Sequence, residues 1–161
     1  MTHIGFGARN FSIAVYIGNR PPIEPYHSLS SLHALENGEV KQLADLTGNH
    51  WRKIFNVYAK LLYTLDCAGT NSWQEYRDQI LLTAVSREAL LFSRPLFERN
   101  KIHIITGRQY ANSLDLKLPL IEIDDDFQLA EAKNCIVCPY FDYRQLSNAK
   151  IETLADLIRK I

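Results

Sequence analysis

The fold expected for this chain is decided by residues 134–161, NCIVCPYFDYRQLSNAKIETLADLIRKI. The stretch begins with a short apolar run, residues 134–138, which is typical of a buried strand. Pro139 has no backbone N–H and should end the hydrogen bonding of that strand. After a loop rich in aromatic and polar side chains, Ser147 or Asn148 can cap a helix whose apolar residues recur on one face. Strand, loop and helix form the repeating unit of an open α/β sheet, in which ligands bind at the loops that follow the strands.

The composition is that of one globular domain. Of the 161 residues, 47% are apolar and 22% are charged, which is ordinary for a chain that buries a single core. No segment reaches the roughly 18 uninterrupted apolar residues of a membrane helix. The first ten residues lack the basic and apolar regions of a secretory signal. We therefore expect a single cytoplasmic domain over residues 1–161, without membrane contact.

Charge and cysteine content exclude several function classes. The 18 basic and 18 acidic side chains cancel, so no overall field attracts nucleic acid, and such binding would need a local patch. Cys67, Cys135 and Cys138 are an odd number of thiols, which argues against a disulfide framework. Cys135 and Cys138 lie along an expected strand and should face opposite sides of it, so we interpret them as core thiols rather than a redox pair. The sequence shows no zinc-ligand spacing, and we expect neither a metal nor a cofactor.

Strand and helix patterns alternate along the rest of the chain. The expected strands are residues 11–17, 102–106, 118–123 and 134–138, the first two ended by Gly18 and Gly107. The expected helices cover residues 40–46, 49–67, 72 to beyond 91, 108–114, 124–133 and 148–161. This alternation predicts a three-layer α/β/α sandwich with a mainly parallel sheet of about four strands.

Parallel strands would bring several polar segments to one edge of the sheet. Residues 18–20, 107–109, 124–125 and 139–145 would leave from that edge, and the helix start at 49–53 can join them with its free backbone donors. Clustered arginines would attract an anion, and the aromatic side chains would stack on a planar ligand. The candidate ligand-binding residues are Gly18, Asn19, Arg20, Arg52, Gly107, Arg108, Tyr140, Phe141, Tyr143 and Arg144.

Simpler interpretations remain open for the same side chains. The arginines could be solvated or paired with acidic neighbours, and the aromatic residues could form a local core beneath the loop. The candidate catalytic residues are Asn19, His50 and Asp142. His50 could act as a general acid or base, or simply lie at the surface, and Asp142 could orient a water molecule or pair with a cation. Motifs for a P-loop, a dinucleotide site and a hydrolase nucleophile elbow are absent.

Four segments resemble, in order, motifs of the uracil-DNA glycosylase superfamily, whose members have a small four-stranded parallel sheet between helices. Residues 14–22, AVYIGNRPP, look like its first strand and G-x-x-P-G loop, and residues 47–49 like its glycine-bearing helix entry. Residues 104–111, IITGRQYA, are similar to its strand ending in L-G-x-x-A. Residues 138–140, CPY, stand where the family has H-P-S.

The resemblance implies a fold and a base-sized pocket, without normal glycosylase activity. Cys138 stands in place of the histidine that stabilises the departing base in that family, and the iron–sulfur cysteines of some branches are absent. Asn19 could serve as the residue that orients the attacking water. Since the chemistry of the site rather than the fold sets function, glycosylase activity does not follow from the fold.

Three functions are compatible with these observations. The leading hypothesis is a binding or accessory protein that takes a nucleotide, a nucleobase or another small anionic ligand at the carboxyl edge of the sheet. The first alternative is an atypical base-excision glycosylase or another hydrolase that uses Asn19, His50 or Asp142. The second is a non-catalytic interaction domain, in which Leu29, Leu32 and Leu35 or the last helix cover another chain.

Overall fold

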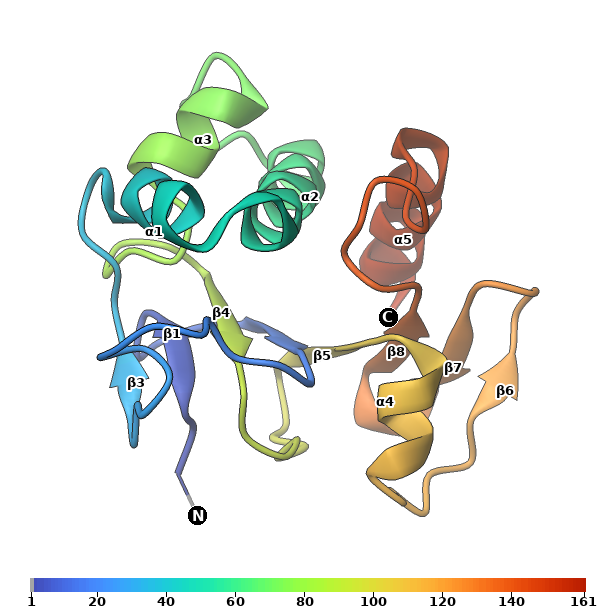
Figure 1. Cartoon of the computed structure of the whole chain (residues 1–161). Helices are drawn as coiled ribbons and strands as arrows, with labels where there is room; N and C mark the ends of the chain where they lie inside the picture. The colour runs from blue at the N-terminus through green and yellow to red at the C-terminus, as the bar shows by residue number, and fades with distance from the viewer. Residues whose placement is uncertain (1) are drawn as a thin grey trace.

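A computed structural model describes residues 2–161 of the chain, which form one eight-stranded sheet covered mainly by helices (Figure 1). The sheet order is β3-β1-β4-β2-β5-β8-β7-β6. The strands are β1 (Gly5–Gly7), β2 (Ile13–Tyr16), β3 (Leu32–His33), β4 (Glu88–Leu91), β5 (Ile102–Thr106), β6 (Ile121–Glu122), β7 (Gln128–Ala130) and β8 (Cys135–Cys138). The helices are α1 (Glu39–Thr47), α2 (Asn49–Leu65), α3 (Trp73–Gln79), α4 (Arg108–Ser113) and α5 (Asn148–Lys160), with a 3₁₀ turn η1 at Glu131–Lys133.

The four central strands, β4, β2, β5 and β8, are all parallel. On one side β1 pairs antiparallel with β4 and parallel with β3. On the other side β7 pairs antiparallel with β8, and β6 antiparallel with β7. The expectation of a mainly parallel sheet of about four strands is therefore wrong for the complete sheet. It has eight strands, and most pairings of the four outer strands are antiparallel. Those outer strands have two or three residues each, too few for alternation to be recognised in the sequence.

Helices α1, α2, α3 and α5 lie on one face of the sheet, and the single short helix α4 lies on the other (Figure 1). Val15, Ile104 and Ile136 face the larger helical core that contains the buried residues of α1, α2 and α5. Ala14, Ile105 and Val137 face the smaller core, which contains Ala111 and Leu114 beside α4. The expected layer of helices is therefore present on one face only. On the other face loop residues, among them Phe97, Leu116 and Leu118, supply much of the cover beside the six-residue helix α4.

Several elements match their sequence prediction. The strands expected at residues 11–17, 102–106 and 134–138 are confirmed as β2, β5 and β8. The helices expected near residues 40–46 and from residue 49 onward are confirmed as α1 and α2. The Ser147 side chain accepts a hydrogen bond from the backbone N–H of Lys150, so the cap predicted for α5 is also confirmed.

The long helix expected from residue 72 to beyond residue 91 is wrong. Helix α3 ends at Gln79, and Glu88–Leu91 form the buried central strand β4. The Glu88 carboxylate accepts hydrogen bonds from the Tyr76 hydroxyl at 2.7 Å and from the Leu82 N–H at 2.9 Å. Leu82 has a φ of 60°, which breaks a helix. Tertiary contacts therefore override the helix preference of this segment.

The elements expected between residues 118 and 133 are also corrected. The expected parallel strand is the two-residue edge strand β6, which forms an antiparallel hairpin with β7. The expected helix at 124–133 is absent, because the Asp124 carboxylate accepts the N–H groups of Asp126 and Phe127 and closes a turn. Residues 124–126 thus link two strands.

The two cysteines of β8 are buried on opposite faces, as expected. Cys138 belongs to the larger core and Cys135 to the smaller one. Burial raises the pKa of both thiols, that of Cys135 to about 12, so they are protonated and unreactive at neutral pH. Among the described residues, no helix has both the length and the apolar character needed to cross a membrane.

Candidate ligand-binding cleft

A cleft of about 620 Å³ opens at the carboxyl ends of β2, β5 and β8. Three of the segments that the sequence predicted to meet do line it. Their contributions are Gly18 and Asn19 after β2, Thr106 to Tyr110 and Ser113 at the end of β5 and in α4, and Tyr140 and Gln145 after β8. Parallel strands side by side bring these distant segments to one edge of the sheet.

Backbone hydrogen bonds and close packing shape the cleft. The N–H of Gly107 donates to the carbonyl of Cys138 at 2.7 Å, and the Thr106 hydroxyl donates to the carbonyl of Tyr16 at 3.0 Å. The ends of β2, β5 and β8 are thereby tied to one another. Gly18 packs directly against Tyr110, since a Cβ atom at position 18 would lie 2.9 Å from the aromatic ring. Residue 18 must therefore lack a side chain for Tyr110 to occupy this wall.

Asn19, His50 and Tyr140 form a triangle of polar contacts beside the cleft. The Tyr140 hydroxyl donates to Asn19 Oδ1 at 2.8 Å. His50 Nε2 lies 3.0 Å from Asn19 Nδ2 and 2.9 Å from the Tyr140 hydroxyl. Burial raises the pKa of Tyr140 to about 12, against a lowering contribution from Asn19, so the side chain stays a neutral phenol. Two of the three candidate catalytic residues, Asn19 and His50, are thus in direct contact.

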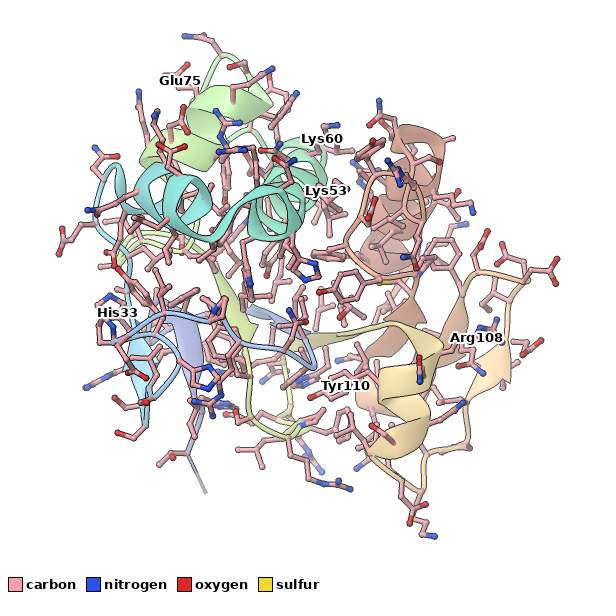
Figure 2. All side chains as sticks on the ribbon, viewed as in Figure 1. His33, Lys53, Lys60, Glu75, Arg108 and Tyr110 are labelled. Carbon is pink, nitrogen blue, oxygen red and sulfur yellow. The ribbon has the colours of Figure 1, made fainter. Side chains whose placement is uncertain are left out.

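The four candidate arginines have separate partners, and only Arg108 lines the cleft. Arg108 donates to the Glu122 carboxylate and to the carbonyls of Asp124 and Asp125, which fastens α4 to the β6–β7 hairpin. In Figure 2 the labelled Arg108 and Tyr110 lie on opposite sides of α4. Asp124 and Asp125 were expected at the same edge, but they do not line the cleft; their backbone carbonyls accept hydrogen bonds from Arg108 instead.

The other three arginines stabilise local structure away from the cleft lining. Arg20 donates to the carbonyls of His27 and Leu29, and its guanidinium lies 5.8 Å from the centre of the Phe92 ring. Arg52 pairs with Asp45 on α1. Arg144 is exposed and donates to the Tyr143 hydroxyl. The expected pocket of four convergent arginines is not formed.

Two of the three candidate aromatic residues, together with Asp142, have structural roles. Phe141 is fully buried, 5.5 Å from the ring of Tyr58. Tyr143 is half exposed, and the amino group of Lys53 lies 5.3 Å from its ring. The Asp142 carboxylate accepts the N–H of Arg144 and lies 3.8 Å from the Lys53 amino group. These three residues fold the loop after β8, and Tyr140 alone turns its polar atom toward Asn19.

Three lining residues lie outside the segments that the sequence placed at this edge: Thr106, Tyr110 and Ser113. Tyr110 and Ser113 are three residues apart in α4 and therefore share a helix face. Polar residues at this spacing, in a helix that begins directly after a strand, were the sequence feature that could have indicated these two lining residues. Within residues 2–161, no group of three or more His, Cys, Asp or Glu side chains is arranged to hold a metal ion.

Comparison with known proteins identifies the family to which this chain belongs. Neither the curated proteins nor the solved structures contain a significant match to this chain. One protein-family model matches residues 4–159, which is nearly the whole chain. The chain therefore belongs to the family of unknown function DUF6942.

Proposed function

We propose that this protein binds a small planar ligand of the nucleobase type in the cleft at the carboxyl ends of β2, β5 and β8. The observation that carries the proposal is the lining itself, which combines the rings of Tyr110 and Tyr140 with the amides of Asn19, Gln109 and Gln145. Aromatic faces stack on flat ligands, and amide and hydroxyl groups recognise their polar edges.

The cleft favours an uncharged ligand over a strongly anionic one. Arg108 is the charged side chain in the lining, and its guanidinium already donates to Glu122 and to two backbone carbonyls. A multiply charged phosphate group would have to compete for those donors. The resemblance to the uracil-DNA glycosylase superfamily supports the same ligand class. The free thiols of Cys67, Cys135 and Cys138 fit the reducing cytoplasm, which we keep as the proposed location.

A thermal-shift screen tests this function. Free bases, nucleosides, nucleotides, inorganic phosphate and short single-stranded DNA are added in turn, and a ligand that binds the folded state raises Tm. We expect bases or nucleosides to raise Tm and phosphate alone to leave it unchanged. If no base or nucleoside shifts Tm at millimolar concentration, the proposal is wrong.

A pair of variants assigns the binding to this cleft. Ser113 lines the cleft, whereas its neighbour Asn112 is also exposed and does not line it. Ser113→Trp should fill the cleft and abolish the ligand-induced shift, while Asn112→Trp should retain it. Both residues lie at the end of α4, so we expect the two substitutions to affect the stability of the fold to a similar extent. Equal shifts in the two variants would place the ligand elsewhere.

A second candidate function is base excision or a related hydrolysis, which the contact between Asn19 and His50 favours. An amide beside an imidazole could orient and activate a water molecule. Incubation with uracil-containing DNA, in parallel with Asn19→Ala, tests it through release of the base. Cleavage that persists in the variant would exclude Asn19 as the catalytic group.

The interaction-domain alternative finds little support in the packing. Leu35 is buried, and Leu29 and Leu32 pack against the two cores. The apolar face of α5 is also covered, since Ile151, Leu154 and Ile158 are buried. These leucines and the apolar face of α5 therefore pack against other parts of the same chain rather than presenting a surface to a partner.

A further inference from the structure

Strand β6 is an open edge of the sheet. It is the last strand in the sheet order and lies at the outer margin of the molecule, beyond α5 (Figure 1). The N–H of Ile123 donates to the Phe127 carbonyl at 2.9 Å, so residue 123 directs its backbone polar groups toward β7. Because these groups alternate in direction along a strand, Glu122 directs its N–H and C=O away from the sheet. The edge therefore offers one donor and one acceptor on the same residue.

The same edge exposes two isoleucines on one face. Ile121 and Ile123 are 68% and 45% exposed, respectively. Ile121 pairs with Leu129 and Ile123 lies opposite Phe127, and both of these β7-side residues pack in the larger core. Since residues opposite each other share a face, the isoleucines lie on the helical side of the sheet and extend the larger core to the edge. At the other edge, both residues of β3 are half-buried.

The opposite face of β6 carries one positive and one negative charge. The Glu122 carboxylate accepts a hydrogen bond from Arg108 at 2.6 Å. Leu120, two residues before Glu122, packs against the smaller core, which places this face on the side of α4. Both charged side chains are exposed, so they can also interact with a chain that lies along the edge.

We propose that β6 is a self-association surface, at which β6 of a second copy of this chain pairs antiparallel about a twofold axis at Glu122. The N–H and C=O of Glu122 then exchange hydrogen bonds with Glu122 of the second copy. Ile121 lies opposite Ile123 of the second copy, and the symmetry repeats this contact. These isoleucines occupy the non-hydrogen-bonded positions of the pair, where side chains approach most closely. Four isoleucines thereby cover one another.

Charge complementarity favours a second copy in this orientation. On the face of α4, two Glu122 carboxylates meet two Arg108 guanidinium groups, so the charges at the axis balance. The acidic turn at 124–126 lies opposite Leu120 of the second copy, and the two turns are about 13 Å apart along the strands. That separation exceeds the screening length of about 8 Å at physiological salt. A parallel arrangement would instead place the two acidic turns side by side, about 4.8 Å apart.

The pairing is short, so the dimer forms only at high protein concentration. Contact through residues 121–123 of each copy buries less than the roughly 1,200 Å² at which standard interfaces begin. We therefore expect single chains at about 10 µM and a growing share of dimer toward about 1 mM. The cleft opens at the carboxyl ends of β2, β5 and β8, so this association does not depend on the ligand proposed above.

Sedimentation equilibrium over this concentration range tests the association. Ile121→Lys places an ammonium group against an isoleucine twice in each dimer and should raise the dissociation constant at least about tenfold. Val85→Lys is the matched control, since Val85 is 82% exposed between α3 and β4, and it should leave the constant unchanged. Single chains at every concentration, or equal effects of the two substitutions, would overturn the proposal.

A cysteine at the twofold axis tests the register. Residues opposite each other in a hydrogen-bonded antiparallel pair have Cα atoms about 5.5 Å apart, which a disulfide can span. Cys67→Ser first removes the exposed native thiol. In that background, Glu122→Cys should link two copies under mild oxidation, whereas Asp125→Cys, exposed in the same hairpin, should not. The absence of a link at position 122, or equal linking at both positions, would overturn the proposed pairing.

Discussion

At the scale of single residues, the cleft depends on how closely Gly18 and Tyr110 approach. The ring of Tyr110 occupies the space that a side chain at position 18 would need. Gly18 has no left-handed φ, so its requirement is steric rather than conformational. A glycine directly after a strand indicates a position where another group packs closely against the backbone. The sequence does not show which residue that is.

Gly18→Ala should therefore destabilise the protein through Tyr110. The added Cβ forces the ring aside, which typically costs about 1–3 kcal/mol for overpacking. The free energy of unfolding from urea titration measures the change. In a Tyr110→Ala background the same substitution should cost much less, because the obstructing ring is gone. An equal cost in both backgrounds would contradict the steric explanation.

Glu88 is a buried carboxyl group with a pH-dependent contribution to stability. Burial raises its pKa above the ordinary value of 4.5, although hydrogen bonds from Leu82 and Tyr76 and the charge of Arg87 act in the opposite direction. The folded state therefore holds the proton more strongly than the unfolded state does. The contribution is complete below pH 4.5 and is lost as the pH rises through the folded-state pKa.

Glu88→Gln should remove this dependence. The free energy of unfolding of the wild type, relative to Glu88→Gln, should fall as the pH is raised from about 4.5 to about 8. Urea titrations at several pH values measure the difference between the two proteins. A wild-type stability that rises against the variant over this range would mean that the donors to Glu88 outweigh its burial.

At the scale of secondary-structure elements, contacts with distant residues decide which patterns become helices or strands. Glu88 and its neighbours have a helix-forming composition, yet they form a central strand between β1 and β2. The β6–β7 hairpin similarly replaces an expected helix, because Asp124 closes its turn. Helices α2 and α5 were predictable because each has many residues and one continuous apolar face.

The β6–β7 hairpin should depend on Arg108 locally rather than globally. Arg108 joins α4 to Glu122 and to the carbonyls of Asp124 and Asp125. The ion pair is well exposed, so Arg108→Ala should cost less than about 1 kcal/mol in global stability. Amide hydrogen exchange in residues 121–127 should nevertheless become faster.

Lys117→Ala serves as the control for this prediction. Lys117 lies in the connection between α4 and β6 and forms an exposed pair with Asp115. Removal of its charge should not change exchange in the hairpin. Unchanged exchange in Arg108→Ala would show that the backbone pairing of β6 with β7 suffices without this anchor.

At the scale of the whole molecule, the sheet has a buried parallel centre and short outer strands. All residues of β2, β4 and β8 are buried, and so are four of the five residues of β5. Both residues of β6 are exposed, and those of β3 are half buried. Burial of both faces protects the hydrogen bonds of the central strands, whereas the sheet edges can open separately.

Native-state hydrogen exchange should therefore follow the order of the strands. The amides of β2, β4, β5 and β8 should exchange only through global unfolding, and those of β3 and β6 through local opening with a much smaller free energy. Exchange rates measured in increasing denaturant separate the two classes. Equal protection of β6 and β2 would contradict this division of the sheet.

The sequence by itself determined three of the four central strands, the main helices and three of the segments that meet at the cleft. These features depend on local periodicity and on strand ends, which adjacent residues encode. It did not determine β4, the antiparallel edges, the separate partners of the four arginines, or the contact of His50 with Asn19 and Tyr140. Only the tertiary structure decided these, because residues 31 and 90 positions apart from His50 set its hydrogen bonds, and no local pattern records such distances.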